Sequence, residues 1–346
     1  MGVVIGPDLG IWKGPTIREI ARLSGVGTAT VDRVLNGRAG VREKTRQKVL
    51  ATLAQLNNGA QAEAPQGVRT VAFLTDSGRS FNQSLQDAVE RYTASDPGVV
   101  CSFTSILTAD VNPVTLAQLI ERTAETSQGL VLVAREDVTV NRAVRAVTSR
   151  GVPVVCITSD LPGSSRIAYV GSDQVAAGST AAYLMGRMLG KIGGKILLVV
   201  SASYRAQAER EMGFRSVLRA EFQRLEVDER ANSHDDFDFV YTGVRKYLDD
   251  HGAPVGIYNV SAGNLGIASA LGDSGLKGKV VFIGHELNSN SRMLLETDAM
   301  EFVIGHDLDV EVAKSIGAIE AYFKGSPPTS PPLTPVRVYT KYSCRY

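Results

Sequence analysis

Short apolar runs alternate with amphipathic stretches along most of this chain, from residue 71 onward. Between the runs, apolar residues recur at the three- and four-residue spacing of helices. The runs that we interpret as strands cover 71–75, 99–105, 129–134, 153–158, 195–201, 254–260, 279–285 and 300–306. Strands that alternate with helices form mainly parallel sheets covered by helices on both faces. So many strands over this length favour two doubly wound α/β lobes over one.

Residues 16–56 show a different pattern, that of a small all-α unit with three short helices. Thr16 and Glu19 match the T-x-x-E capping box at the start of the first helix. A turn with two glycines, SGVG, precedes a second helix at 28–35, and the third covers 43–56. A helix, a short glycine-containing turn and a second helix make up the helix-turn-helix unit.

Residues 57–70 separate the two patterns and are rich in Gly, Pro, Gln and Ala without an apolar period. We interpret this stretch as a linker. The predicted organisation is therefore a helix-turn-helix headpiece at 16–56, a linker at 57–70 and a two-lobed body at 71–346. Within the body, the first lobe is expected at about 71–177 and 308–329, and the second at about 178–307 and 330–346.

Charge is concentrated in the helical segment, although the whole chain has a net charge of only +1. Residues 16–56 contain eight basic and three acidic side chains, a net charge of +5 that leaves −4 for the rest. A compact basic unit on a mildly acidic body is the electrostatic footprint of DNA binding. Charge alone is equally compatible with a solvated helical face.

Several classes of protein are disfavoured by motifs that the sequence lacks. Cys101, Cys156 and Cys344 are too few and too widely spaced for a disulfide framework. No apolar run is long enough for a membrane span, and the N-terminus lacks the pattern of a secretory signal. We therefore expect a cytoplasmic protein without a membrane contact.

Enzyme and metal motifs are also missing. The stretch HELNS carries Ser289 where the H-E-x-x-H zinc motif has its second histidine. Neither a G-x-S-x-G elbow nor a G-x-x-x-x-G-K-[ST] phosphate loop occurs, and the four histidines lack zinc-ligand spacing. The sequence predicts no catalytic residues, no cofactor and no metal.

Polar side chains follow strand after strand of the predicted body. In doubly wound sheets, ligands bind at the carboxyl ends of the strands, where these side chains would meet. Carboxylates, amides and a guanidinium, together with an aromatic ring, suit a polyhydroxylated ligand. For any single residue, a helix cap or a satisfied loop group is an equally good reading. The candidates are Phe81, Asn82, Glu136, Asp160, Arg210, Asn264, Glu286 and His306.

Short motifs add a resemblance to a known family. The helical segment contains the pieces A-x-x-x-G-V, T-V-x-R-V-L-N and K-T-R-x-K-V. With these it resembles the DNA-binding headpiece of the LacI-type family of lactose, galactose and purine repressors. The body contains YVGSDQVAAG, REMGFRSVL and FIGHE. It resembles that family's effector domain, which is similar to the periplasmic sugar-binding proteins of the ribose type.

The resemblance implies roles for individual residues of the headpiece. Thr28, Ala29 and Arg33 match the base-reading face of the recognition helix, and Arg33 would bridge O6 and N7 of a guanine. Matches to backbone-positioning places are Thr16, Thr30, Asn36, Thr45 and Arg46.

The resemblance also bears on the body. Asp160, Arg210, Glu286 and His306 match sugar-binding positions of the ribose type. Asn264 lies near another such position, and Phe81 approximates an aromatic residue that packs on the sugar.

Three departures from the family pattern stand out. Asp32 and Arg42 replace serines, and 57–70 lacks the Asn-x-x-Ala-x-x-Leu pattern of the hinge helix. In relatives, the leucine of that pattern wedges into the minor groove. Asp32 can pair with Arg18 or Arg22 on the neighbouring helix, or accept a hydrogen bond from a cytosine amino group.

The function that these observations predict is a sequence-specific transcriptional regulator, most simply a repressor. We expect a homodimer on a roughly palindromic double-stranded operator. A small sugar, polyol or sugar acid bound between the lobes would control DNA affinity. The alternative is a solute-binding protein without a transcriptional role.

Overall fold

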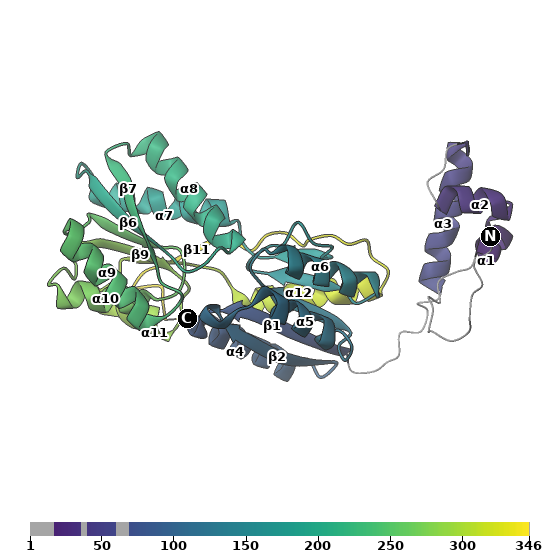
Figure 1. Cartoon of the computed structure of the whole chain (residues 1–346), viewed down its shortest axis with the longest axis horizontal. Helices are drawn as coiled ribbons and strands as arrows, with labels where there is room; N and C mark the ends of the chain where they lie inside the picture. The colour runs from purple at the N-terminus through teal and green to yellow at the C-terminus, as the bar shows by residue number, and fades with distance from the viewer. Residues whose placement is uncertain (1–16, 36–39, 60–68, 346) are drawn as a thin grey trace. The chain divides into compact units, whose positions relative to one another are not determined.

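The computed structural model describes residues 17–35, 40–59 and 69–345. These residues form two compact units, one built from the N-terminal helices and the other from the α/β body (Figure 1).

The N-terminal unit consists, in its described part, of the three helices that the sequence predicts. They are α1 (Ile17–Ser24), α2 (Thr28–Leu35) and α3 (Glu43–Gly59). Gly25 ends α1 with a φ of 62°, a conformation that glycine adopts without strain. The small core consists of Ile20, Val31, Val34 and Val49. Helix α3 continues three residues past its expected end at residue 56. Thr16 of the predicted capping box lies outside the described residues.

The first lobe of the body is built on a parallel sheet, whose order among the described residues is β2-β1-β3-β4-β5. Its strands are β1 (Arg69–Ser77), β2 (Val99–Leu107), β3 (Gly129–Val133), β4 (Val154–Ile157) and β5 (Ala168–Val170). Its helices are α4 (Arg79–Ser95), η1 (Thr108–Asp110), α5 (Pro113–Thr123) and α6 (Val138–Ser149). Apolar side chains of α5 and α6 pack on β1, β3 and β4 to form its core.

The second lobe has the described strand order β11-β10-β9-β8-β6-β7, in which only β11 is antiparallel to its neighbour. Its strands are β6 (Gly194–Val200), β7 (Leu225–Asn232), β8 (Gly256–Asn259), β9 (Val281–His285), β10 (Phe302–Gly305) and β11 (Arg337–Tyr339). Its helices are α7 (Gln174–Leu189), α8 (Arg205–Glu221), α9 (Phe237–His251), α10 (Asn264–Asp273) and α11 (Ser289–Glu296). Helices α7 and α8 cover one face and α9 to α11 the other (Figure 1).

All eight predicted strands are present, and three strands were not predicted. Strands β5 and β11 have three residues each, too short for an apolar period. Strand β7 lies at the sheet edge and reads LEVDERAN, a sequence with four charged residues and no apolar run. An edge strand that faces water needs no apolar run, so its sequence resembles a loop.

Three chain crossings join the lobes within residues 69–345. They follow β5, follow β10 and precede β11. Helix α7 packs on α8, so the first crossing lies at 171–173, a few residues before the boundary expected at 177. Ser172 and Thr334, from the first and third crossings, form a β-bridge. The last body helix, α12 (Leu308–Phe323), follows the second crossing and returns to the first lobe, where Ile319 meets Gly129 of β3.

Candidate functional site

A cavity of about 980 Å³ opens between the two lobes. The first lobe contributes the starts of α4 and α12. The second lobe contributes the starts of α9, α10 and α11 and the ends of β9 and β10. Three of the predicted effector residues line it: Asn264, Glu286 and His306. The carboxyl ends of neighbouring strands thus converge as the doubly wound topology requires.

Glu286 is the most unusual of the lining residues. It follows β9 with a φ of 70°, in a region that residues other than glycine rarely adopt. Its Oε2 atom is buried without a hydrogen-bond partner among the described residues. Burial raises the pKa of its carboxyl, while the charges of Arg210 and His306 act in the opposite direction. A strained backbone that holds an unpartnered acceptor in a cavity is what a ligand donor would complete.

Asn264 supports the wall of the cavity. It begins α10 directly after Gly263, which has a φ of 97°. Its Nδ2 donates to the carbonyl of His285 at 2.9 Å, and its Oδ1 accepts from Asn259 Nδ2 at 2.7 Å. These bonds fix the ends of β8 and β9 relative to each other.

Five predicted effector residues do not line this cavity. Phe81 and Asn82 are buried in the first turn of α4, where Asn82 accepts from Thr75 and donates to the carbonyl of Ser77. Asp160 binds the Arg166 guanidinium through both carboxylate oxygens. Asn82 and Asp160 thus have hydrogen-bond partners close in sequence. Their role as effector ligands stays a prediction.

Arg210, the fourth, is buried on α8. Its Nε donates to Gln174 Oε1 and its Nη1 to the carbonyl of Val260, each at 2.8 Å. It thereby joins α8, α7 and the end of β8. Its charge acts on Glu286 and His306, which places it near both. A direct contact with an effector stays a prediction.

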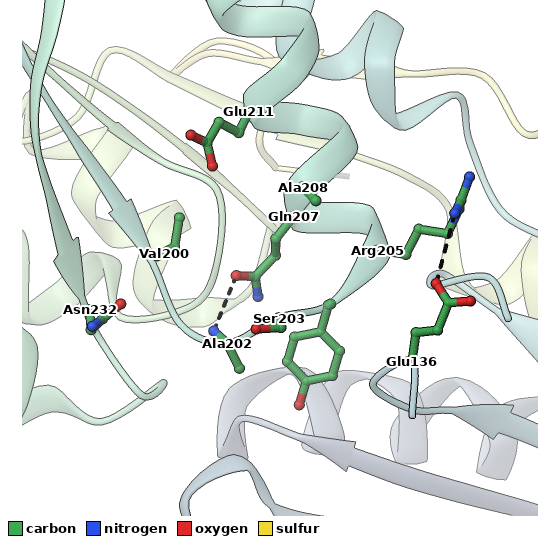
Figure 2. A pocket seen from close by; sticks show the side chains of 10 residues that line it. Glu136, Val200, Ala202, Ser203, Arg205, Gln207, Ala208, Glu211 and Asn232 are labelled. Atoms are coloured by element: carbon green, nitrogen blue, oxygen red, sulfur yellow. Dashed lines mark hydrogen bonds and ion pairs between the residues drawn. The ribbon is translucent and has the colours of Figure 1, made fainter. Parts of the chain in front are cut away.

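Glu136, the remaining predicted residue, lines a second cavity of about 570 Å³ (Figure 2). Figure 2 shows it facing Arg205, at 3.8 Å between Oε2 and Nη1. On the other side, Gln207 accepts from the amides of Ser201 and Ala202 and donates to Ser201 Oγ. These polar groups already have protein partners, so this cavity presents a weaker case for a ligand.

Direct bonds between the lobes border the cavities, and the predicted site did not include them. The Tyr204 hydroxyl, after β6, donates to the carbonyl of Asp76, near the end of β1. Thr108 Oγ1 donates to Asp235 Oδ2 at 2.8 Å. A Cβ on Gly78 would lie 2.5 Å from the Cβ of Asp235, so the lobes touch there. A sequence signal was available, because Asp76 follows the predicted strand at 71–75 and Tyr204 comes shortly after the one at 195–201.

The candidate DNA-reading face lies on α2. Thr28, Ala29 and Arg33 are exposed, whereas Val31 and Val34 are buried against the other helices. The predicted backbone-contacting residues Thr30, Thr45 and Arg46 are half-buried, and Thr16 and Asn36 lie outside the described residues. Asp32 is half-buried and has an interaction partner. The helix therefore presents an exposed arginine among small side chains.

Models of two families match the chain in these same two parts. The model of the bacterial regulatory proteins of the lacI family matches residues 16–58. The model of the periplasmic binding protein domain matches residues 71–327, well over half of the chain. The chain belongs to the periplasmic binding protein domain family and carries a lacI-family headpiece. The fold and the resemblance that the sequence predicts are thereby confirmed.

Curated relatives match the headpiece region. The transcriptional regulator TreR of Salmonella typhimurium is 42% identical over 74 residues, which are 20% of this chain and 24% of TreR. The transcriptional repressor PurR of Vibrio cholerae is 39% identical over 82 residues, which are 22% of this chain and 24% of PurR. Each match thus spans about a quarter of the relative's length.

Solved structures match the periplasmic-binding-protein body. A solute-binding protein from Burkholderia graminis in complex with D-arabinose superposes with a TM-score of 0.75 at 21% identity, covering 81% of this chain and 98% of the other. GanP, a glucose-galactose binding protein from Geobacillus stearothermophilus, has a TM-score of 0.72 at 17% identity and covers 81% and 99%. At this identity the likeness shows the fold. No described helix is long and apolar enough to cross a membrane.

The buried Asp76 gives the body a pH dependence that can be measured. Burial raises the pKa of its carboxyl from 3.8 to about 6, although Arg135 lowers it. The native state therefore binds a proton more readily than the unfolded state, and the carboxylate costs stability above pH 6. Lowering the pH from about 7.5 to about 5 should raise the free energy of unfolding by about 1.4 kcal/mol through this group.

Urea unfolding of the protein and of Asp76→Asn at both pH values isolates this effect. The stability difference between the two proteins should change with pH in favour of the unaltered chain as pH falls. A difference that stays the same at both pH values would contradict the assignment.

Proposed function

We propose that this protein is a transcriptional repressor whose operator affinity is controlled by a sugar, polyol or sugar acid bound between its lobes. One observation carries the proposal: a single chain joins a lacI-family headpiece to a two-lobed body whose cavity holds the unpartnered Glu286. The names of TreR and PurR as transcriptional regulators support the DNA-binding role. The protein would act in the cytoplasm, without catalysis, as a homodimer on a roughly palindromic operator.

The cavity suggests how an effector is sensed. A hydroxyl that donates to Glu286 removes the cost of its buried, unpaired oxygen. The effector then bridges groups of both lobes and favours one degree of closure over another, which shifts the population of two body states. The three crossings are the segments that would bend. The two headpieces of a dimer would change their spacing and lose operator affinity.

The alternative is a solute-binding protein, which the body alone would suggest. The likeness to the GanP and Burkholderia graminis structures supports a sugar-like ligand under either reading. The headpiece favours the repressor, because solute binding does not require an exposed helix with an arginine, whereas DNA binding does.

A thermal-shift screen over pentoses, hexoses, polyols and sugar acids tests the effector site. A compound at 100 times its Kd should stabilise the body by about 2.7 kcal/mol. Glu286→Gln should weaken binding of that compound about tenfold, because a charged acceptor becomes a neutral one.

Glu136→Gln is the matched control, since it makes the same change in the other cavity. It should leave the affinity unchanged. Loss of affinity in Glu136→Gln alone would move the site to the second cavity, and no stabilisation by any compound would refute the sugar-like effector.

A further inference from the structure

A buried carboxyl group lies where the lobes join, and the sequence did not single it out. Glu311, in the first turn of α12, has no exposed surface. Its Oε1 accepts from Thr334 Oγ1 at 2.7 Å, and its Oε2 accepts from Thr158 Oγ1 at 3.4 Å. His306 Nδ1 lies 2.9 Å from Oε1. Burying a carboxyl group costs free energy unless hydrogen bonds or an opposite charge compensate it, as these neighbours do.

The partners of Glu311 come from three separate parts of the joint. Thr158 follows β4 in the first lobe and has a φ of 63°. His306 lies in the second crossing, directly after β10, and Thr334 lies in the third. One carboxyl group therefore joins the loop after β4 to the second and third crossings.

His306 connects this cluster to the cavity. Its Nδ1 is buried without a hydrogen-bond partner among the described residues and lies 2.9 Å from Glu311 Oε1, so Glu311 is the charged group that it meets. The ring lines the cavity, and its remaining polar atom, Nε2, is on the opposite edge. The orientation of the ring thus decides which hydrogen-bonding atom of His306 faces the cavity.

The charges around His306 favour its protonated form. Burial acts against the charge, and so does Arg210, but the adjacent carboxylate of Glu311 and the nearby Glu286 outweigh them. The pKa of His306 is raised above its ordinary value as a result. His285, which also interacts with this group, has its pKa lowered by burial and is neutral, with Nε2 2.8 Å from the Tyr258 hydroxyl.

We propose that Glu311 is a positioning residue that fixes the orientation and charge of His306 and thereby decides which group the effector meets. The proposal rests on the proposed function, because it concerns the same cavity. A charged His306 turns an Nε2–H donor toward the cavity, beside the Glu286 acceptor. An effector atom at His306 must then accept a hydrogen bond, as a hydroxyl, a ring oxygen or a carboxylate does.

The test follows the His306 side chain by long-range proton–nitrogen NMR in the full chain without any effector. Only four histidines are present, so His306→Gln assigns the signal. Below its midpoint of titration, both nitrogens should carry protons. Above it, the neutral ring should be the Nδ1–H tautomer, and the midpoint should lie above 6.5.

Glu311→Gln removes the charge and keeps the shape. It should lower the midpoint, because the adjacent negative charge that favours the protonated ring is gone. Thr334→Val removes a hydrogen bond to the same carboxyl without changing its charge, and it should leave the midpoint near that of the unaltered chain. A neutral ring in the Nε2–H tautomer would overturn the proposal. A midpoint that Glu311→Gln does not lower would overturn it as well.

This result is independent of whether the effector is found. Should no sugar stabilise the protein, the proposed effector class fails while the His306 measurement keeps its meaning. The tautomer of the unaltered chain decides the matter even if Glu311→Gln does not fold.

Discussion

Replacing Gly178 with alanine is expected to lower the free energy of unfolding of the body by about 3 kcal/mol. A Cβ there would lie 1.8 Å from the backbone carbonyl oxygen of Arg210 on α8. The contact is reciprocal, because a Cβ on Gly213 of α8 would lie 2.1 Å from the carbonyl oxygen of Val175 on α7. Both obstacles are backbone atoms, which cannot rotate away. The two helices would have to separate.

Urea unfolding followed by circular dichroism measures this loss. Gly317→Ala in α12 is the matched control, since no neighbouring atom in the described part of the chain lies within 4 Å of the place that its Cβ would take. It should stabilise the protein by up to about 1 kcal/mol through helix propensity. Equal stability of the two variants would show that α7 and α8 do not cross as closely as described.

Gly178→Ala should also weaken ligand binding in the cavity between the lobes. Displacing the backbone of Arg210 moves its guanidinium away from Gln174 and Val260, which it joins at 2.8 Å. The close helix crossing therefore positions the charge that acts on Glu286 and His306. Sugar binding by Gly178→Ala should weaken even at temperatures where the variant remains folded.

Arg33→Ala is expected to weaken operator binding by about 1–3 kcal/mol, or roughly 5- to 160-fold. Arg33 is exposed on α2, and the small residues Thr28 and Ala29 allow close approach to the groove. Specific and general affinity are separated by fluorescence anisotropy with two duplexes at one salt concentration. One duplex is the natural fragment upstream of the protein's own coding sequence, and the other is a scrambled duplex. The loss should appear on the natural fragment and be small on the scrambled one.

Arg46→Ala is the comparison for that measurement. Because Arg46 is a predicted phosphate contact, Arg46→Ala should lose the same affinity on both duplexes. If Arg33→Ala shows the same uniform loss, Arg33 contacts the backbone and does not read a base.

The alternation of apolar runs and helical stretches predicted the architecture well, because buried parallel strands must be apolar throughout. Glu286 and His306 were identified for a related reason. They follow β9 and β10 directly, and the topology of a parallel sheet brings such positions together.

The same rule predicted Asp160 and Asn82, which also follow strands, and their role as effector ligands stays a prediction. Asp160 forms an ion pair with Arg166, six residues later in the chain. Asn82 donates to the backbone at the end of β1. Position after a strand places a side chain at the edge of the sheet. It does not say whether a neighbour will satisfy it.

Glu311 escaped prediction for the opposite reason. A glutamate in the first turn of an amphipathic helix reads as a solvated residue that complements the helix dipole. Its partners Thr158 and Thr334 are distant in sequence, and only the folded joint between the lobes brings them to it.

The central claim is that an effector in the body controls the affinity of the headpiece for DNA. The most direct measurement titrates the full chain onto its natural upstream DNA, with and without the compound that stabilises the body. The account predicts tight binding to this fragment, weaker binding to a scrambled duplex, and a marked loss of specific affinity when the compound is present. Equal affinity for both duplexes, or an affinity that the compound leaves unchanged, would contradict it.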